Sequence, residues 1–285
     1  MKILYINPDP PNVYRYYSDL ENALSRIVVC NSNNPDVIVY GLNWLRCERP
    51  VPVKWLVLPQ ICFVHKIGLG WERKERFLKT CDLVLSSVPE LPIKHTLFRY
   101  GVDPAVFYDR GEKIFDFGFS GALHEAHLYP PGTFENENIR SKTQELARKQ
   151  TDLSLLFLNG SDSIKPRIRS YEKYAEVLSQ AKIWMSTTGP NGDIGPRYYE
   201  VMASKTLLFC DRPPKKYRRV FRDGVNCVWF DLDNFTDKLR YYIDHEQERN
   251  KIIETAYREC ITNHTWRARA LELIDIINAT LQRLR

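Results

Sequence analysis

The sequence predicts an α/β protein built from two doubly wound domains. Short, continuous apolar segments alternate with longer segments of helical periodicity along the whole chain, which is the pattern of parallel strands buried on both faces. Strands that alternate with helices favour a doubly wound sheet over a bundle or a sandwich. The polar segment Tyr108–Lys113 divides this pattern and suits a linker. A chain of 285 residues is long enough to give each part its own core.

The first part of the chain carries predicted strands joined by two predicted helices. The strands are Lys2–Ile6, Asp36–Tyr40, Lys54–Leu58, Asp82–Ser86 and Thr96–Tyr100, and the helices are Tyr14–Arg26 and Gly70–Thr80. Doubly wound sheets bind ligands beyond the carboxyl ends of their strands. In these connecting segments His65 is the one imidazole, so it is a candidate catalytic residue. A structural role is the alternative for a lone histidine that follows an apolar run.

The second part of the chain repeats the alternation. The strands are Ile114–Ser120, Leu153–Leu158, Ile183–Met185 and Thr206–Cys210, and the helices are Asn138–Gln150, Ser170–Ala181, Arg197–Ala203, Asn234–His245, Glu246–Asn263 and Trp266–Leu284. We therefore expect an N-terminal domain of residues 1–110 and a C-terminal domain of residues 111–285.

The stretch Lys182–Pro213 reads as strand, glycine-bearing loop, short helix and strand. A loop that feeds a helix presents unpaired backbone N–H groups, which favours phosphate binding. Arg197 adds a planar guanidinium suited to phosphate, and Glu200 leaves the same helix face three residues later. This pair is suited to a diphosphate and a ribose hydroxyl. The alternative is an ordinary α/β unit with an exposed loop.

Four segments resemble known sequence patterns. The sequence RYYEVMA from Arg197 resembles the R-x-x-E-x-M-A signature of GT-B glycosyltransferases of the group 1 and spore-maturation-type branch. FRYGVDPAVF, from Phe98, resembles the G-V-D-x-x-x-F turn of many group 1 enzymes, and DFGFSGAL, from Asp116, resembles the G-F-x-G-x-L opening of their donor domain. Tyr129-Pro130 with Arg140 matches a Y-P…R pattern of the same branch.

The resemblance implies a GT-B fold, in which two Rossmann-like domains face each other across a cleft. A compact N-terminal domain would meet the acceptor, the second domain would hold a nucleotide-sugar donor, and the last helix would pack back on the first domain. Many relatives carry an acidic residue at the position of Gly192, and Asp193 is a candidate substitute. The donor-binding residues implied in this way are Gly121, Arg140, Asp193, Arg197, Tyr198 and Glu200. For Arg140 and its neighbour Lys142, the alternative is a solvated position at the start of a helix.

The function that the resemblance implies is transfer of a hexose or pentose from a nucleotide-sugar to a hydroxyl of a glycan or glycoconjugate. It implies no bound metal and no cofactor beyond the sugar nucleotide as co-substrate. Two alternatives remain open on the sequence. One is a non-catalytic GT-B relic that binds a nucleotide or glycan, and the other is a sugar-nucleotide epimerase of the same fold.

Composition and charge restrict the partners and the compartment. A net charge of +6 suits an anionic small ligand or weak attraction to an anionic surface, so peripheral membrane contact is compatible with it. The sequence lacks the clustered basic stripe of a nucleic-acid binder. We interpret the basic run Lys215–Arg219 as a solvated surface helix. We expect Asp231 and Asp233 to cap a helix rather than bind a metal.

The seven cysteines form no C-x-x-C pair, which favours buried thiols in a reducing cytosol. No apolar run reaches the length of a membrane span, and the start of the chain does not resemble a signal peptide. We therefore expect a cytoplasmic protein without a transmembrane segment.

Overall fold

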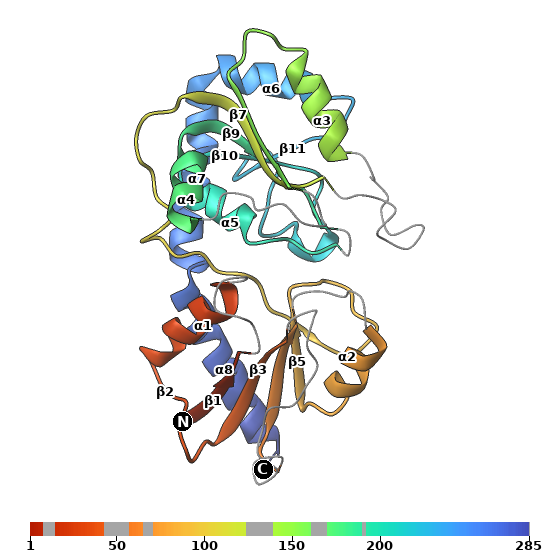
Figure 1. Ribbon diagram of the computed structural model, residues 1–285, viewed down its shortest axis with the longest axis vertical. Coiled ribbons are helices and arrows are strands. Elements are labelled where there is room, and N and C mark those ends of the chain that lie inside the picture. Colours follow the sequence, from red (N-terminus) through yellow and green to blue (C-terminus); the bar gives the residue numbers. More distant parts are fainter. Residues whose placement is uncertain are drawn as a thin grey trace. The chain divides into compact units, whose positions relative to one another are not determined.

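The computed structural model describes residues 1–7, 15–42, 57–64, 71–123, 139–160, 170–189 and 192–284. The chain divides into two compact units, each with its own parallel sheet (Figure 1). Unit 1 comprises Met1–Gly101 and His264–Arg285, and unit 2 comprises Val102–Asn263. Both units have the doubly wound α/β architecture that the sequence predicts.

The sheet of unit 1 has the strand order β2-β1-β3-β4-β5-β6, and all neighbouring strands are parallel. The strands are β1 (Lys2–Ile6), β2 (Val29–Cys30), β3 (Val37–Leu42), β4 (Gln60–Val64), β5 (Leu83–Ser86) and β6 (Thr96–Leu97). The helices are α1 (Arg15–Ser25), α2 (Trp71–Leu78) and α8 (Trp266–Leu284).

Helices cover both faces of this sheet, as Figure 1 shows. Tyr40 meets Phe77 of α2 edge-to-face on one side. Phe63 meets Tyr17 of α1 on the other side, where α8 lies beside α1. Gly41 belongs to the α1 face, because a Cβ atom there would lie 2.4 Å from the Tyr17 ring. The alternation of side chains along each strand therefore feeds two separate layers of packing.

Strand β4 was not predicted, and most of a neighbouring predicted strand lies outside the described residues. We expected a strand at Lys54–Leu58, but the described residues of that segment, Val57 and Leu58, lie in a turn, and Val57 is 88% exposed. The strand that the structure shows here is β4, and all five of its residues are buried. The run Ile61–Val64 is apolar without interruption, as a central parallel strand requires. The two-residue strand β2 was not predicted, whereas β6 comprises the first two residues of the predicted strand Thr96–Tyr100.

The sheet of unit 2 has the strand order β11-β10-β9-β7-β8, again parallel throughout. The strands are β7 (Phe115–Ala122), β8 (Leu155–Gly160), β9 (Ala181–Met185), β10 (Leu207–Cys210) and β11 (Val228–Trp229). The helices are α3 (Ile139–Arg148), α4 (Tyr171–Ser179), α5 (Arg197–Ala203), α6 (Phe235–Asp244) and α7 (Glu246–Asn263), with the short 3-10 helix η3 (Lys215–Tyr217). The bounds of α5, α7 and α8 match the sequence prediction.

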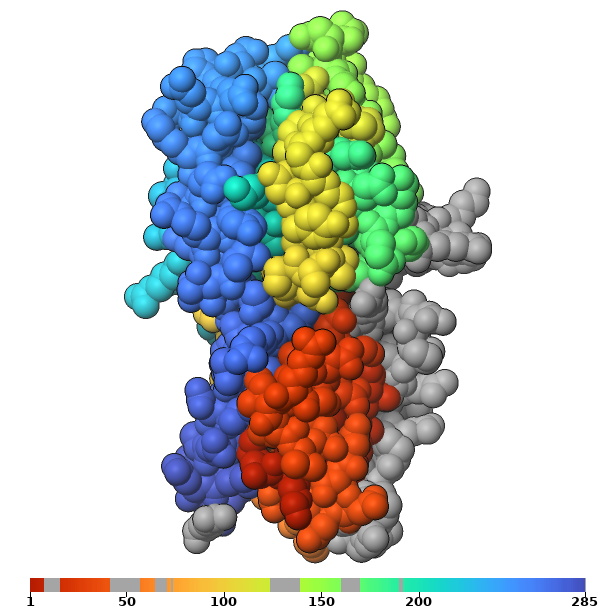
Figure 2. All heavy atoms as spheres, turned by 90° about the vertical axis from the view of Figure 1, so that its left-hand side faces the viewer, coloured from red at the N-terminus to blue at the C-terminus, as the bar shows by residue number. Residues whose placement is uncertain are grey.

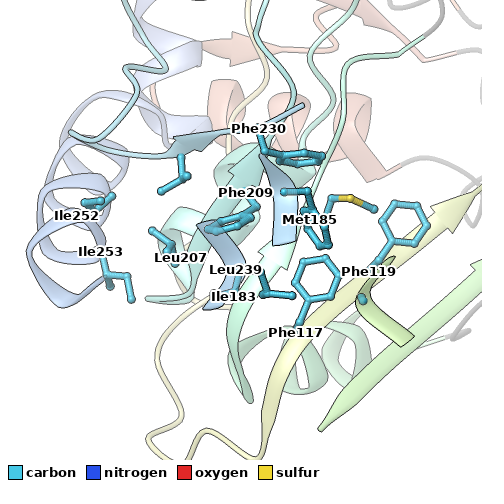
Figure 3. Close-up of a cluster of buried hydrophobic side chains, with 13 residues drawn as sticks. Phe117, Phe119, Ile183, Met185, Leu207, Phe209, Phe230, Leu239, Ile252 and Ile253 are labelled. Carbon is cyan, nitrogen blue, oxygen red and sulfur yellow. The ribbon is translucent and has the colours of Figure 1, made fainter. Parts of the chain in front are cut away.

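One face of this sheet forms the main hydrophobic core of unit 2 (Figure 3). Phe117 and Phe119 of β7 point to the same side as Ile183 and Met185 of β9. Helices α3, α6 and α7 close this layer, and their buried members are Ala147, Phe235, Leu239, Ile252 and Ile253. Fully burying a side chain of this size stabilises the fold by about 1.5–3 kcal/mol. This layer is therefore a main source of the stability of unit 2.

The opposite face carries α4 and α5. Gly118 of β7 is paired with Trp184 of β9, and the indole meets Tyr174 of α4 at a ring distance of 6.5 Å. The segment that enters β7 runs over the outside of unit 2 beside α4 (Figure 2, yellow beside green). From this segment Phe107 packs edge-to-face on Tyr171 at 5.0 Å and on Tyr174 at 6.0 Å. The GVDPAVF turn thus supports α4 directly.

Two further expectations need correction. Strand β7 continues through Gly121 and Ala122, whereas we expected it to end at Ser120. Asp231 does not cap α6: its carboxylate accepts the N–H groups of Asp233 and Asn234 in the turn before the helix. Asn234 is the N-cap residue and makes no side-chain cap bond.

Candidate nucleotide-sugar site

The sheet of unit 2 has one topological switch point, between β7 and β9. From β7 the chain proceeds to β8 on one side and to β9, β10 and β11 on the other. Doubly wound sheets bind ligands at the carboxyl ends of the strands that flank such a point. Here those ends carry Gly121 and Ala122 on β7, and Ser186 and Thr187 directly after β9. The carboxyl-end edge of β7 and β9 is therefore the candidate ligand site of unit 2.

Arg197 and Glu200 lie at the start of α5 and face helix α4. Arg197 donates from Nε to the hydroxyl of Tyr174 at 3.0 Å. The hydroxyl of Tyr171 donates to Oε1 of Glu200 at 3.3 Å. Glu200 is 4% exposed, which is rare for a carboxylate without specific partners. Helix α5 has only seven residues, so the Arg197 side chain, rather than the helix terminus, is the group at this edge that is suited to an anion.

Gly121 brings the end of β7 close to Arg197. Its φ is +140°, a conformation that residues with a side chain rarely adopt. A Cβ atom at this position would lie 3.2 Å from Nη1 of Arg197. The glycine therefore leaves room for the guanidinium at the switch point.

Arg140 lies beneath the same edge. Its side chain donates from Nη1 to the carbonyl of Ala122 at 2.6 Å, and from Nε to Oγ1 of Thr187 at 2.6 Å. The residue is 8% exposed, so the solvated alternative is wrong for Arg140, whereas Lys142 is exposed. Burial, together with the nearby charge of Arg197, lowers the pKa of Arg140 to about 10, which still leaves it charged at neutral pH. Arg140 thus ties the ends of β7 and β9 together and adds positive charge there.

The glycine loop is held by its own backbone and by Asp193. Gly189 N–H donates to the Asp193 carbonyl at 2.8 Å, and Gly192 N–H donates to the Gly189 carbonyl at 2.9 Å. Gly192 has a φ of +72°, a backbone conformation that favours glycine. A Cβ atom at Gly189 would lie 2.1 Å from Oδ1 of Asp193. The Asp193 carboxylate therefore packs back into the loop.

Asp211 is a site residue that the sequence reading missed. One carboxylate oxygen accepts bonds from the backbone N–H of Thr188 at 2.7 Å, the hydroxyl of Thr188 at 3.0 Å and the hydroxyl of Tyr198 at 3.2 Å. Burial raises its pKa above the usual value. Asp211 thus holds the backbone where the glycine loop begins. Tyr198 is buried inside unit 2 and supports Asp211 through its hydroxyl. The only signal in the sequence is an acidic residue at the carboxyl end of an apolar run.

The structure thus gathers Gly121, Arg140 and Arg197 at one edge of the sheet. Asp193 lies near Arg140, and Tyr198 and Glu200 follow Arg197 on α5. His65 and Tyr129-Pro130 lie outside the described residues. Within those residues, no group of three or more His, Cys, Asp and Glu side chains is arranged to hold a metal ion.

Most basic side chains of the run Lys215–Arg219 are exposed, as expected, and its helical part is short. It contains η3, whose Tyr217 is buried, while Lys215, Lys216 and Arg219 are exposed. Arg218 donates to the carbonyl of Pro213 at 2.9 Å. Over the described parts of the chain, no helix is long and apolar enough to cross a membrane.

Comparison with known proteins agrees with this architecture. Residues 159–275 match the model of a glycosyl transferase-like family, a segment that contains β9, α5 and β10. No curated protein matches the chain in sequence.

Solved structures share the fold at low sequence identity. The Anabaena protein HepE in complex with UDP-glucose is 12% identical, with a TM-score of 0.58 over 98% of this chain and 100% of HepE. AviGT4, a glycosyltransferase involved in avilamycin A biosynthesis, is 9% identical, with a TM-score of 0.55 over 96% of each chain. Sucrose-phosphate synthase from Thermosynechococcus elongatus is 12% identical, with a TM-score of 0.58 over 87% of this chain and 74% of its own.

Two parallel α/β sheets, a switch-point edge lined by arginines and the match over residues 159–275 lead to one assignment. The chain has the fold of GT-B glycosyltransferases, and its residues 159–275 match a glycosyl transferase-like family model.

Proposed function

We infer that this protein transfers a sugar from a nucleotide-sugar donor to a hydroxyl group of a glycan or glycoconjugate acceptor. The observation that carries the proposal is the placement of Arg197 beside Gly121 at the switch point of unit 2. Arg197 would bind the donor diphosphate, and Glu200 would bind a ribose hydroxyl. Structures of HepE with UDP-glucose and of a pneumococcal O-GlcNAc transferase with UDP and GlcNAc support this donor class.

The chemistry explains why arginines are needed at this edge. Transfer converts the nucleoside diphosphate into a leaving group, so negative charge grows on the phosphates as the sugar bond breaks. Cationic groups already in position stabilise that charge without reorganisation. Arg197 would contact the phosphates, and the buried charge of Arg140 would add to the potential from below. We therefore propose that these groups make a bound metal or further cofactor unnecessary.

The acceptor side of the proposal is less specific. GT-B proteins hold acceptors with their N-terminal domain, and we retain His65 as the candidate catalytic residue of unit 1. Cys30, Cys81, Cys210 and Cys227 are thiols without a disulfide, which suits a reducing cytoplasm. We therefore propose a cytoplasmic enzyme that is free to contact a membrane surface peripherally.

A thermal-shift panel tests the donor site. The protein is heated with UDP, GDP and ADP and with their sugar conjugates, next to Arg197→Ala and Glu200→Ala. A ligand at about 100 times its Kd stabilises the folded state by about 2.7 kcal/mol, which corresponds to a Tm increase of about 5 °C. We expect one base to produce this shift in the wild type and both variants to lose it. Arg219→Ala, which removes an exposed arginine of the same unit, should keep it.

Product analysis then separates transfer from its rivals. With the stabilising donor and a mixture of acceptors, a glycosyltransferase releases nucleoside diphosphate and forms a glycosylated acceptor. An epimerase changes the sugar of the donor without an acceptor, and a non-catalytic relic leaves the donor intact. A wild type that no nucleotide stabilises at millimolar concentration would contradict the donor site itself.

A further inference from the structure

Helices α4 and α5 meet through two matched pairs of polar side chains. On α4, Tyr171 and Tyr174 lie one turn apart, and on α5, Arg197 and Glu200 have the same spacing. Side chains at this spacing lie on one face of a helix. Tyr174 bonds to Arg197, and Tyr171 bonds to Glu200. The two residues that we assign to the donor are therefore each held by a different tyrosine hydroxyl.

The Tyr174 hydroxyl lies between Arg197 and the end of β7. It accepts the Nε–H of Arg197 at 3.0 Å and lies 3.4 Å from the hydroxyl of Ser120. Ser120 points to the α4 side because it alternates with Phe119, which belongs to the core on the other face. Burial raises the pKa of Tyr174 to about 12, so the hydroxyl stays neutral at physiological pH.

These contacts fix the direction of the guanidinium. Arg197 donates its Nε–H to the Tyr174 hydroxyl. Its Nη1 atom lies next to Gly121 and would be only 3.2 Å from a Cβ atom at that position. A guanidinium is planar, so holding one edge determines where the other N–H groups point. The rings of Phe107 and Trp184 in turn hold the phenol of Tyr174 in place.

We propose that Tyr174 is a positioning residue that directs Arg197 toward the donor diphosphate, and that it acts on the phosphates alone. The proposal rests on the proposed function, because it takes the diphosphate as the ligand of Arg197. Tyr171 provides the contrast: it holds Glu200, the proposed ribose ligand, and therefore acts on the nucleoside part of the donor.

The test compares Tyr174→Phe with Tyr171→Phe. Both variants remove one hydroxyl from the same face of α4 and keep a ring against Phe107, so they are matched in packing. Calorimetry measures the Kd of the nucleoside diphosphate that stabilises the wild type most, with UDP tried first, and ligand-observed NMR measures its parent nucleoside. A lost hydrogen bond to a charged group corresponds to roughly tenfold in affinity.

We expect Tyr174→Phe to weaken the diphosphate about tenfold and to leave the nucleoside unchanged. Tyr171→Phe should weaken both by the same factor, because both contain the ribose. In an Arg197→Ala background, adding Tyr174→Phe should cause no further loss, since residues that act through one contact are not additive.

Three results would overturn the proposal. Equal weakening of nucleoside and diphosphate by Tyr174→Phe would mean that the hydroxyl only stabilises the fold. An unchanged diphosphate affinity in Tyr174→Phe, with a wild type that binds it, would refute the positioning role and leave the donor site standing. A wild type that binds no nucleoside diphosphate would refute the proposed function as well.

Discussion

At the scale of single residues, glycines in unit 2 mark where a neighbouring side chain needs space. Gly118 of β7 sits against Trp184, and a Cβ atom there would lie 2.4 Å from the indole ring. Gly189 similarly admits the carboxylate of Asp193. Both glycines leave room for a side chain from elsewhere in unit 2. A glycine is needed at these positions because another side chain approaches the backbone closely, and not because the backbone conformation requires one.

Gly118→Ala should therefore destabilise unit 2. The added methyl must displace the buried Trp184 ring, and overpacking of this kind costs about 1–3 kcal/mol. Gly195→Ala is the matched control, because no atom lies within 4 Å of a Cβ at that position, and it should change stability by less than about 0.5 kcal/mol. Urea denaturation measures both. Equal midpoints for the two variants would contradict the packing argument.

Residue identities predicted part of the candidate site. Arg197 and Glu200 were visible because their spacing on one short helix is a local property. The hydroxyl partners Tyr174 and Tyr171 were not, since they lie 23 and 29 residues away in the chain. Asp211 was missed for the same reason: its bond to the Thr188 N–H spans 23 residues. Local spacing indicates which side chains share a face, but not which other element that face meets.

At the scale of elements, the long apolar and amphipathic segments were predictable, and the edges of the sheets were not. Helices α7 and α8 have the predicted bounds because each carries enough turns for its periodicity to be read. Strands β2 and β11 have two residues each, so they exist through pairing with a neighbour rather than through any pattern of their own. Strand β4 was not predicted, and it is buried between β3 and β5, with which it pairs.

Helix α4 offers a test at this scale, since it presents both tyrosines to α5. It has nine residues, and Ser170 is the N-cap residue that precedes it. The Ser170 hydroxyl accepts the N–H of Lys173 at 3.1 Å. Short helices depend on such caps, and replacing a serine cap by alanine costs about 1 kcal/mol. Ser170→Ala should therefore lower the stability of unit 2 by that amount.

Ser25→Ala is the control for this prediction. Ser25 is also exposed, but its hydroxyl bonds back to the carbonyl of Glu21 at the end of α1 and caps no N–H group. It should change stability by less than about 0.5 kcal/mol. Chemical denaturation of the two variants measures the difference, and an equally mild effect in both would show that the cap of α4 contributes nothing.

At the scale of the whole molecule, the chain closes unit 1 with residues from both of its ends. Helix α8 lies beside α1, although nearly the whole chain separates them. The amphipathic stripe of α8 predicts that one face is covered, but a stripe does not specify its partner. At the start of α8, Trp266 packs on Gly101, where a Cβ atom would lie 2.8 Å from the indole. This return of the chain brings His264 among charged residues of unit 1.

His264 should make the folded protein sensitive to mild acid. Burial, followed by the charges of Arg269 and Arg99, lowers its pKa from 6.5 to about 3. The unfolded chain therefore takes up a proton near pH 6.5 while the folded chain does not, so this contribution to stability is complete above pH 6.5 and is lost as the pH falls toward 3. One pH unit corresponds to about 1.4 kcal/mol, which gives a loss of about 2 kcal/mol between pH 7.5 and pH 5. Urea denaturation at these two pH values should show that His264→Gln removes that part of the loss, whereas His245→Gln, which changes an exposed histidine, leaves it in place. An identical loss in wild type and His264→Gln would mean that His264 takes up its proton as easily in the folded chain as in the unfolded one.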